Sequence, residues 1–337
     1  MSFKRFDAED LVISNDAISS TVWADGDPII SSYYTSSVQV AADSGRYYYD
    51  VYQADVNDTG SALPQFSIAY ADEKGSGSLP YNAAVVGKST TSTVYGQYRS
   101  MVLGDEESTF KFGDIVSEYF YAIPVDRQAY KEKLLTGFTM KLTNGTDSLS
   151  LTDDSLVKPT VSFLDSGRVY QIVSGSQGTV FTGINQNGYT ANDGSYGMFL
   201  PDMGLILLNG KALDAASGDG GIALGTGRTA TDEVNNQKLF NALVLGSQWL
   251  QNTEETVSSN FAFVRVRNSE FNYSVNPSNI TGSGELIHDE MINAPQAFIT
   301  TVGLYNDTND LLATAKLSTP LVKDFTKEAL VRVKLDF

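Results

Sequence analysis

The chain has 337 residues and a formal net charge of −17, with no Cys and a single His. The missing Cys excludes disulfides, thiolate metal sites and a Cys nucleophile, and one His cannot build a multi-His metal site. The negative charge opposes phosphate backbones, so we expect no nucleic-acid partner. No apolar stretch approaches the ~18 residues of a membrane span and no signal-peptide core is visible, so we expect no membrane partner and synthesis in a reducing cytoplasm.

Short runs with the two-residue period of β-strands dominate the first two thirds of the chain, each bounded by Gly, Asn, Asp or Ser. In one of them, Phe138, Met140 and Leu142 share one face and the residues between them are polar. The last of these runs is apolar throughout. We predict strands at 47–52, 66–70, 138–142, 161–164, 168–173 and 204–208.

Two segments carry the start and stop signals of helices. The first, 125–136, lies between Pro124 and Gly137 and contains good helix formers. The second, 231–245, begins with Thr231 as a capping residue and has two acids in its first turn. Its apolar side is predicted to pack on a sheet through Leu239, Ala242, Leu243 and Gly246.

The last third of the chain has the clearest strand pattern. Within 261–267, Phe and Arg side chains alternate with Ala and Val. Two further strands, at 297–305 and 311–317, flank a turn of Asn, Asp and Thr at 306–310, which predicts a hairpin. The final run, 331–337, alternates apolar and charged residues up to the last position, as a half-buried strand does.

Together these elements predict a mainly β fold, made of antiparallel β-sandwich domains with one or two packed helices. A polar, turn-rich stretch from Asn144 to Pro159 predicts a boundary between an N-terminal β-rich domain, 1–150, and a C-terminal β-rich domain, 151–337. The same stretch also fits a long hairpin loop, and the two halves also fit one interleaved sandwich. Both arrangements stay open.

Few residues point to catalysis or ligand binding. His288 lies among carboxylates, but no Ser or Cys elbow motif accompanies it, which favours a surface loop. The Gly-rich segments 75–80 and 225–229 lack both the P-loop ending and the third Gly of a dinucleotide site. We therefore predict no catalytic residue, no cofactor and no enzyme.

Acidic clusters recur along the chain, but none completes a twelve-residue calcium loop with its terminal Glu. We predict no metal site, and a calcium ion held by a loop remains an open alternative. Paired carboxylates also suit a glycosidase, although 40 acids create many accidental pairs. The clusters lie at 25–27, 55–58, 105–107 and 153–154.

Two groups of residues are candidates for protein contacts. The first is a tyrosine cluster, because Tyr suits interfaces as well as it suits any sheet. The second is the apolar face of the final strand, which either docks onto a neighbour by β-augmentation or completes its own domain. The candidate interface residues are Tyr47, Tyr48, Tyr49, Tyr52, Val331, Val333, Leu335 and Phe337.

A set of ordered segments resembles known proteins. It includes Ser-Gly-Arg-Tyr-Tyr-Tyr-Asp-Val-Tyr-Gln at 44–53 and Ser-Gly-Arg-Val-Tyr-Gln-Ile-Val-Ser-Gly-Ser at 166–176. In this order the chain resembles virion structural proteins of large contractile-tailed bacteriophages of the marine and cyanobacterial type, over nearly its whole length. The other segments are 36–40, 97–99, 130–134, 263–268, 271–274, 299–307 and 315–318.

The resemblance implies a structural component of the virion, tail-associated in the baseplate or neck region and assembled in the host cytoplasm. Its partners would be other virion proteins and copies of itself, in an oligomer, and it carries over no catalytic residue. The alternative is a receptor- or glycan-binding tail module that uses the loops around 185–197 on a host-surface glycan. A glycan hydrolase is a third hypothesis, for which the sequence shows no committed acid–base pair.

Overall fold

The computed structural model describes residues 4–36, 47–55, 62–77, 89–158, 160–182, 189–190, 192–229 and 234–336. The chain forms two compact units: unit 1 is Met1–Ala17 with Thr256–Phe337, and unit 2 is Ile18–Glu255. Unit 2 is thus inserted into unit 1 along the chain. The boundary predicted near residue 150 is corrected, because it would cut β9 (Asp147–Asp153), which pairs with strands on both of its sides.

In the described residues, the main sheet of unit 2 has 11 strands, and its strand pairs are antiparallel. Its strands are β2 (Tyr49–Tyr52), β3 (Pro64–Asp72), β6 (Tyr119–Pro124), β8 (Thr139–Asn144), β9, β10 (Ser162–Leu164), β11 (Gly167–Ser176), β12 (Thr179–Val180), β13 (Gly197–Leu200), β14 (Leu205–Asn209) and β15 (Gln248–Leu250). They follow the order β15-β8-β9-β11-β13-β14-β6-β3-β2, with β10 and β12 paired to β11. The mainly β, sandwich-like class is confirmed.

The central strands of this sheet are buried on both faces, which explains the uninterrupted apolar run in β14. Ile206 and Leu208 point into one core, whereas Leu205 and Leu207 point into a second core on the opposite face. In β3, the side chains alternate between the same two cores. The central positions of a strand with a core on each side favour apolar residues on both faces, so the sequence of β14 loses the usual alternation.

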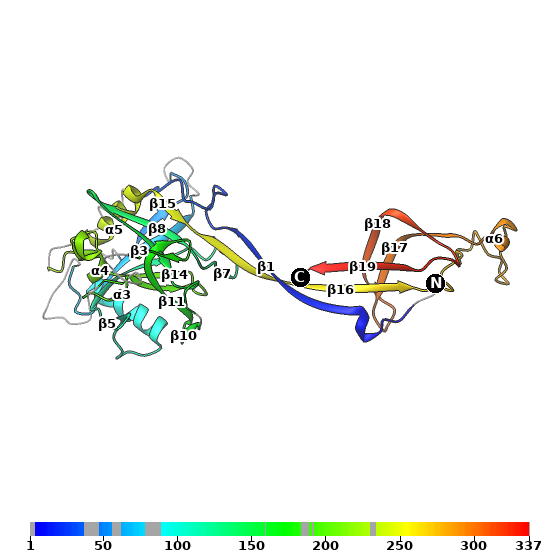
Figure 1. Ribbon diagram of the computed structural model, residues 1–337, viewed down its shortest axis with the longest axis horizontal. Coiled ribbons are helices and arrows are strands. Elements are labelled where there is room, and N and C mark those ends of the chain that lie inside the picture. Colours follow the sequence, from blue (N-terminus) through cyan, green and yellow to red (C-terminus); the bar gives the residue numbers. More distant parts are fainter. Residues whose placement is uncertain are drawn as a thin grey trace. The chain divides into compact units, whose positions relative to one another are not determined.

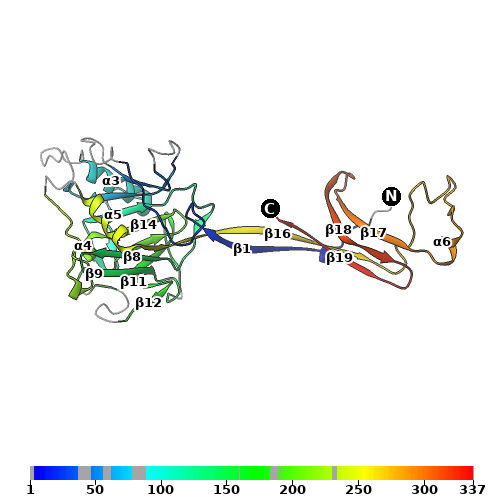
Figure 2. The same ribbon diagram turned by 90° about the horizontal axis from the view of Figure 1, so that it is seen from above.

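The predicted helix at 231–245 is confirmed as α5 (Asn235–Gly246), which lies against β8 (Figure 2). The predicted inner residues Leu239, Ala242 and Leu243 are buried. Gly246 lies so close to the carbonyl of Lys141 in β8 that a Cβ there would collide with it. The predicted cap, Thr231, lies outside the described residues.

The helix predicted at 125–136 is wrong. The segment forms a turn followed by the short strand β7 (Lys133–Leu134), which pairs with the beginning of β16 (Asn252–Val266). The backbone N–H of Asp126 donates to Gln65, and the Tyr130 hydroxyl donates to the Met203 carbonyl at 2.7 Å. These contacts with distant strands outweigh the local helix propensity.

Several short elements were not predicted from the sequence. The most important is α3 (Thr90–Tyr98), which lies against β3 and buries Val94, Tyr95 and Tyr98. Its first turn is capped by Ser89, whose side chain accepts a hydrogen bond from the Ser92 N–H. Further examples are the π-helix η2 (Arg99–Leu103), β4 (Lys111–Phe112), β5 (Ile115–Val116), α4 (Gly210–Asp214) and the 3-10 helix η4 (Ser217–Asp219).

Unit 1 contains a small sheet and a hairpin (Figure 1). The sheet has the order β1-β16-β19, formed by β1 (Leu11–Thr21), β16 and β19 (Ala329–Asp336). The predicted hairpin is confirmed as β17 (Ala297–Tyr305) and β18 (Leu311–Lys323), and Asn306 accepts backbone hydrogen bonds within its turn. Unit 1 also holds the 3-10 helix η1 (Ala8–Asp10) and α6 (Glu290–Asn293).

Candidate functional site

The polar side chains of unit 2 converge around Arg228. Its guanidinium binds Asp72, which is fully buried, at 2.8 Å and Glu118 at 3.0 Å. It also lies over the ring of Tyr119, 4.5 Å from the ring centre. Lys74 binds Glu118 from the outside at 2.7 Å. These residues come from the ends of β3 and β6 and from the loop before α5.

The charged side chains of this cluster form ion pairs with one another. Hydrogen bonds from Lys74 and Arg228 lower the pKa of Glu118. Burial alone would lower the pKa of Arg228, but the hydrogen bond and charge of Asp72 outweigh it and raise that pKa. The other oxygen of Asp72 accepts the backbone N–H groups of Lys74 and Ser76. The cluster therefore fastens the Arg228 loop to the sheet and holds no poised general acid or base.

The other residues considered for chemistry play structural roles where the structure describes them. His288 lies exposed in a loop before α6. The Asp105 carboxylate accepts the N–H groups of Glu107 and Ser108, and Asp153 accepts the N–H of Gly137. Within the described ranges, no group of three or more His, Asp or Glu side chains could hold a metal ion. Parts of the predicted loops at 55–58, 75–80 and 185–197 lie outside those ranges.

The predicted tyrosine interface is mostly internal packing. Tyr49 is buried in the core of unit 2, 5.2 Å from the ring of Phe240. Tyr48 is half-buried and its hydroxyl donates to Gln97, and Tyr52 is half-buried too. Tyr47 is the member of the cluster that stays exposed. Sheet packing, one of the two readings that the sequence leaves open, accounts for most of this cluster.

The final strand completes its own unit rather than projecting from it. Val331 and Val333 of β19 are buried against the β17–β18 hairpin, and Leu335 packs beside them. Val331 pairs with Val264 of β16 in the sheet. These side chains are covered by the chain itself, so they are corrected from docking residues to core residues. Phe337 lies outside the described residues.

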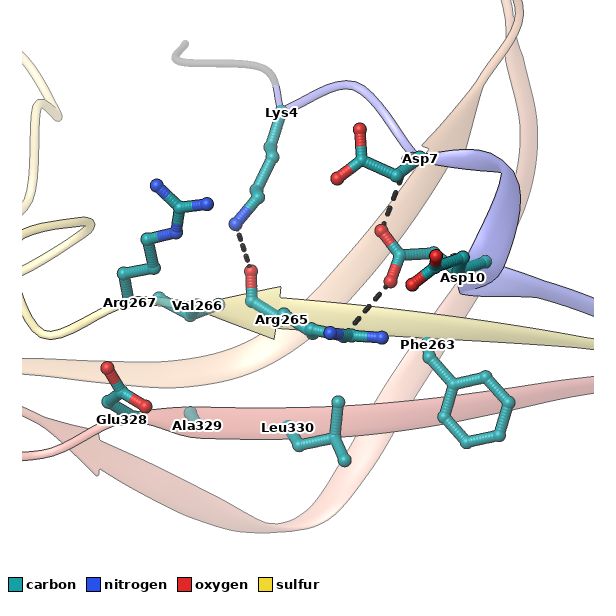
Figure 3. A pocket seen from close by; sticks show the side chains of 11 residues that line it. Lys4, Asp7, Asp10, Phe263, Arg265, Val266, Arg267, Glu328, Ala329 and Leu330 are labelled. Atoms are coloured by element: carbon teal, nitrogen blue, oxygen red, sulfur yellow. Dashed lines mark hydrogen bonds and ion pairs between the residues drawn. The ribbon is translucent and has the colours of Figure 1, made fainter.

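A pocket of about 730 Å³ lies in unit 1 where the N-terminal segment meets β16 and β19 (Figure 3). Arg265 binds Asp10 at 3.1 Å on one side, and Lys4 binds Glu270 at 3.0 Å while donating to the Arg265 carbonyl. Asp10 also accepts the backbone N–H of Asp7. The charges that line the pocket thus hold the N-terminal segment against β16, and they fix where β1 begins.

The most distinctive surface of the molecule belongs to unit 1. Among the described residues, its buried hydrophobic side chains number only four: Ala262, Val266, Val331 and Val333. Eight large apolar side chains among the described residues of the same unit are more than half exposed. They are Leu11, Ile13, Ile292, Phe298, Leu311, Leu312, Phe325 and Leu330. Among the residues that the structure describes, the largely exposed apolar side chains of unit 1 thus outnumber its buried hydrophobic side chains by eight to four.

Sequence reasoning missed β1, although it contributes the most exposed side chain of this set. Ile13 is 74% exposed, and Leu11 and Val12 beside it are exposed too. The available signal was the apolar run Leu11-Val12-Ile13, in which Val12 and Ile13 are β-branched, followed by the β-branched Ile18 and Thr21. The side chains of this strand are exposed on both of its faces, so its sequence has no alternation to detect.

No protein-family model, curated protein or solved structure matches this chain. In the described part of the chain, no helix is both long and apolar enough to cross a membrane.

Proposed function

We propose that this chain is a structural subunit of a tailed-phage virion, located in the tail, baseplate or neck region, and that unit 1 makes its contacts with neighbouring subunits. The observation that supports it is the imbalance in unit 1, where more large apolar side chains are largely exposed than buried. The virion class rests on the resemblance of the ordered sequence segments. The partners are other virion proteins and copies of this chain.

The size of the exposed surface supports an assembly role. At roughly 100 Å² of apolar surface for each half-exposed large side chain, the eight residues expose about 800 Å². This is about the area that each partner contributes to a standard protein interface. A unit of this kind gains its missing core when neighbours cover it, as the subunits of an assembly do.

A localisation experiment tests the proposal. A copy with an affinity tag on its C-terminus would be supplied during infection, and purified particles would be imaged with a tag-specific gold label. We expect label at one station of the tail, together with peptides of the chain in particle digests. Particles that contain neither label nor peptides of the untagged chain would overturn the virion role.

A matched pair of variants separates unit 1 from the rest of the molecule. Leu312→Asp and Phe298→Asp place charge on exposed apolar positions of unit 1, and we expect the chain to fold but to be lost from particles. Leu156→Asp places the same charge at a similarly exposed position of unit 2, where we expect normal incorporation. Equal incorporation of all three variants would contradict the role of unit 1.

A further inference from the structure

The two edges of the unit 1 sheet differ in how they are protected. Edge strands offer unpaired N–H and C=O groups, and proteins guard them with charges, Pro or bulges. At one edge, β19 carries Arg332 and Lys334 on its exposed side, and Arg332 lies over the ring of Phe261. In the described part of the chain, β1 at the other edge pairs only with β16. Its 11 residues include one charge, Asp16, and no Lys, Arg or Pro.

We propose that the edge of β1 pairs with the β1 edge of a second copy of this chain, antiparallel and about a twofold axis, through Leu11–Ala17. The inference deepens the proposed function and rests on it, because it names the first neighbour that unit 1 contacts. The pairing continues the β1-β16-β19 sheet of one copy into the same sheet of the other copy.

The chemistry of β1 favours a second copy over a different protein. Two identical edges related by a twofold axis pair antiparallel without any further complementarity, because every N–H···O=C bond made by one copy is repeated by its symmetry equivalent in the other. Asp16 is the single carboxylate of the strand. If the twofold axis passes at Ser14, Asp16 of one copy lies opposite the neutral Val12 of the other. The same operation at β19, centred on Val333, would place Arg332 opposite Lys334 and create like-charge contacts.

The surroundings of β1 support the pairing in two ways. The Arg265–Asp10 ion pair and the Lys4–Glu270 ion pair hold the segment before β1, so the strand is presented in a fixed position. Ser258 of β16 donates to Asn15 of β1 at 2.9 Å, which fixes the register of the pair on the inner side. The exposed Leu11, Val12 and Ile13 side chains gain cross-strand neighbours when a second strand is added.

The missing Cys makes the test unusually clean, because any introduced thiol is the only one in the chain. Single variants from Leu11→Cys through Ala17→Cys would be purified as full chains and oxidised. Around a twofold axis only one position faces itself, and each step away separates the two Cα atoms by about 7 Å more, beyond the reach of a disulfide. We expect cross-linked dimer to peak at one β1 position and to fall on both sides of it.

The controls separate this pairing from other contacts. Arg332→Cys and Lys334→Cys on β19 should give no cross-linked dimer. Ile13→Lys should convert the dimer seen by light scattering into monomer, whereas Thr300→Lys, at an exposed position of β17, should leave it intact. Circular dichroism of the monomeric Ile13→Lys chain should show the fold unchanged.

Three results would overturn the proposal: a monomeric wild-type chain with no cross-link along β1, equal cross-linking at every position, or cross-linking through β19 instead. Capture of a different virion protein by β1 thiols in particles, with the purified chain monomeric, would likewise assign the edge to another partner. The two proposals fail separately. A β1-linked dimer that is absent from particles removes only the virion role, and a monomer present in particles removes only the β1 pairing.

Discussion

The two units of this chain differ in how much of their apolar surface they bury. Unit 2 has a core on each face of its large sheet, and its aromatic rings pack edge to face, with Trp249 4.8 Å from both Trp23 and Phe66. In unit 1, the β17–β18 hairpin packs on the β1-β16-β19 strands through a small cluster in which only Ala262, Val331 and Val333 are buried among the described residues. Unit 2 has the core of an independent domain, and unit 1 does not.

This difference supports the proposal that unit 1 makes the protein contacts of the chain. A fold that is complete by itself has little apolar surface left to offer, and the large exposed side chains of unit 2 are few relative to its core. Unit 1 uses the same β-branched and aromatic residues but leaves them uncovered. The chain passes between the units twice, within β1 and within β16, so the strand with the open edge belongs to the connection itself.

The largest expected effect is on the free energy of unfolding, and it is measured by making the same Phe-to-Ala substitution once in each unit. Phe120→Ala empties a fully buried site in unit 2, where the ring lies 4.5 Å from Phe110, and should lower the free energy of unfolding by about 3–5 kcal/mol. Phe298→Ala in unit 1 removes a ring that is 63% exposed and should change it by less than about 0.5 kcal/mol. Chemical denaturation of the purified chain measures both.

The same measurement can also contradict the difference in burial between unit 1 and unit 2. If Phe298→Ala destabilised the isolated chain as much as Phe120→Ala, unit 1 would bury Phe298 in solution and the contrast would disappear. Hydrogen exchange by mass spectrometry assigns each loss to its unit, since the peptides of unit 1 and unit 2 are reported separately.

The second effect is smaller and concerns how unit 1 keeps its shape with so small a core. Lys323 is fully buried, and its ammonium donates to the Asn268 carbonyl at 3.0 Å, to the Asn272 side chain and to the Asp324 carbonyl. Lys323→Met leaves these acceptors without their donor and should cost about 1–3 kcal/mol, confined to unit 1. Faster hydrogen exchange in peptides around residues 268–274, with unit 2 unchanged, is the expected measurement.

A matched variant controls for the loss of charge. Lys327→Met removes a Lys that is largely exposed and pairs with Asp324 at 3.2 Å, and it should be nearly silent. Equal effects of the two variants would show that the buried hydrogen bonds of Lys323 do not hold unit 1 together.

Three strands of unit 1, namely β17, β18 and β19, illustrate what the sequence predicts well. The alternation in 331–337 and the turn residues at 306–310 identified β19 and the β17–β18 hairpin, because each depends on neighbours a few positions away. The inner side of α5 was likewise predicted, residue by residue, from its helical period. Local sequence patterns thus predict the strands and helices that bury one face and expose the other.

Elements that depend on distant contacts were missed or wrong. The 125–136 segment has helix formers, but strand pairing by β7 and the burial of Tyr130 decide its structure. Helix α3 is rich in Ser and Thr and forms because Val94, Tyr95 and Tyr98 are buried against the sheet. Val331 and Val333 were expected at an interface for a similar reason, since alternation marks the buried face of β19 and cannot tell whether the same chain or a partner covers it.

The smallest effect is a pH response near the start of β19. Hydrogen bonds from the hydroxyl and the N–H of Thr326, with a smaller contribution from Lys327, lower the pKa of Asp324 to about 2. Because the folded chain favours the charged form, the turn is stabilised above the ordinary pKa of 3.8, and that contribution is lost as the pH falls through about 2. The carboxyl resonance of Asp324, followed by NMR between pH 5 and 1.5, should therefore titrate at a lower pH than that of an unpaired Asp. In Asp324→Asn the low-pH loosening of the turn should vanish, and an Asp324 midpoint near 3.8 would show that the turn does not hold the carboxylate.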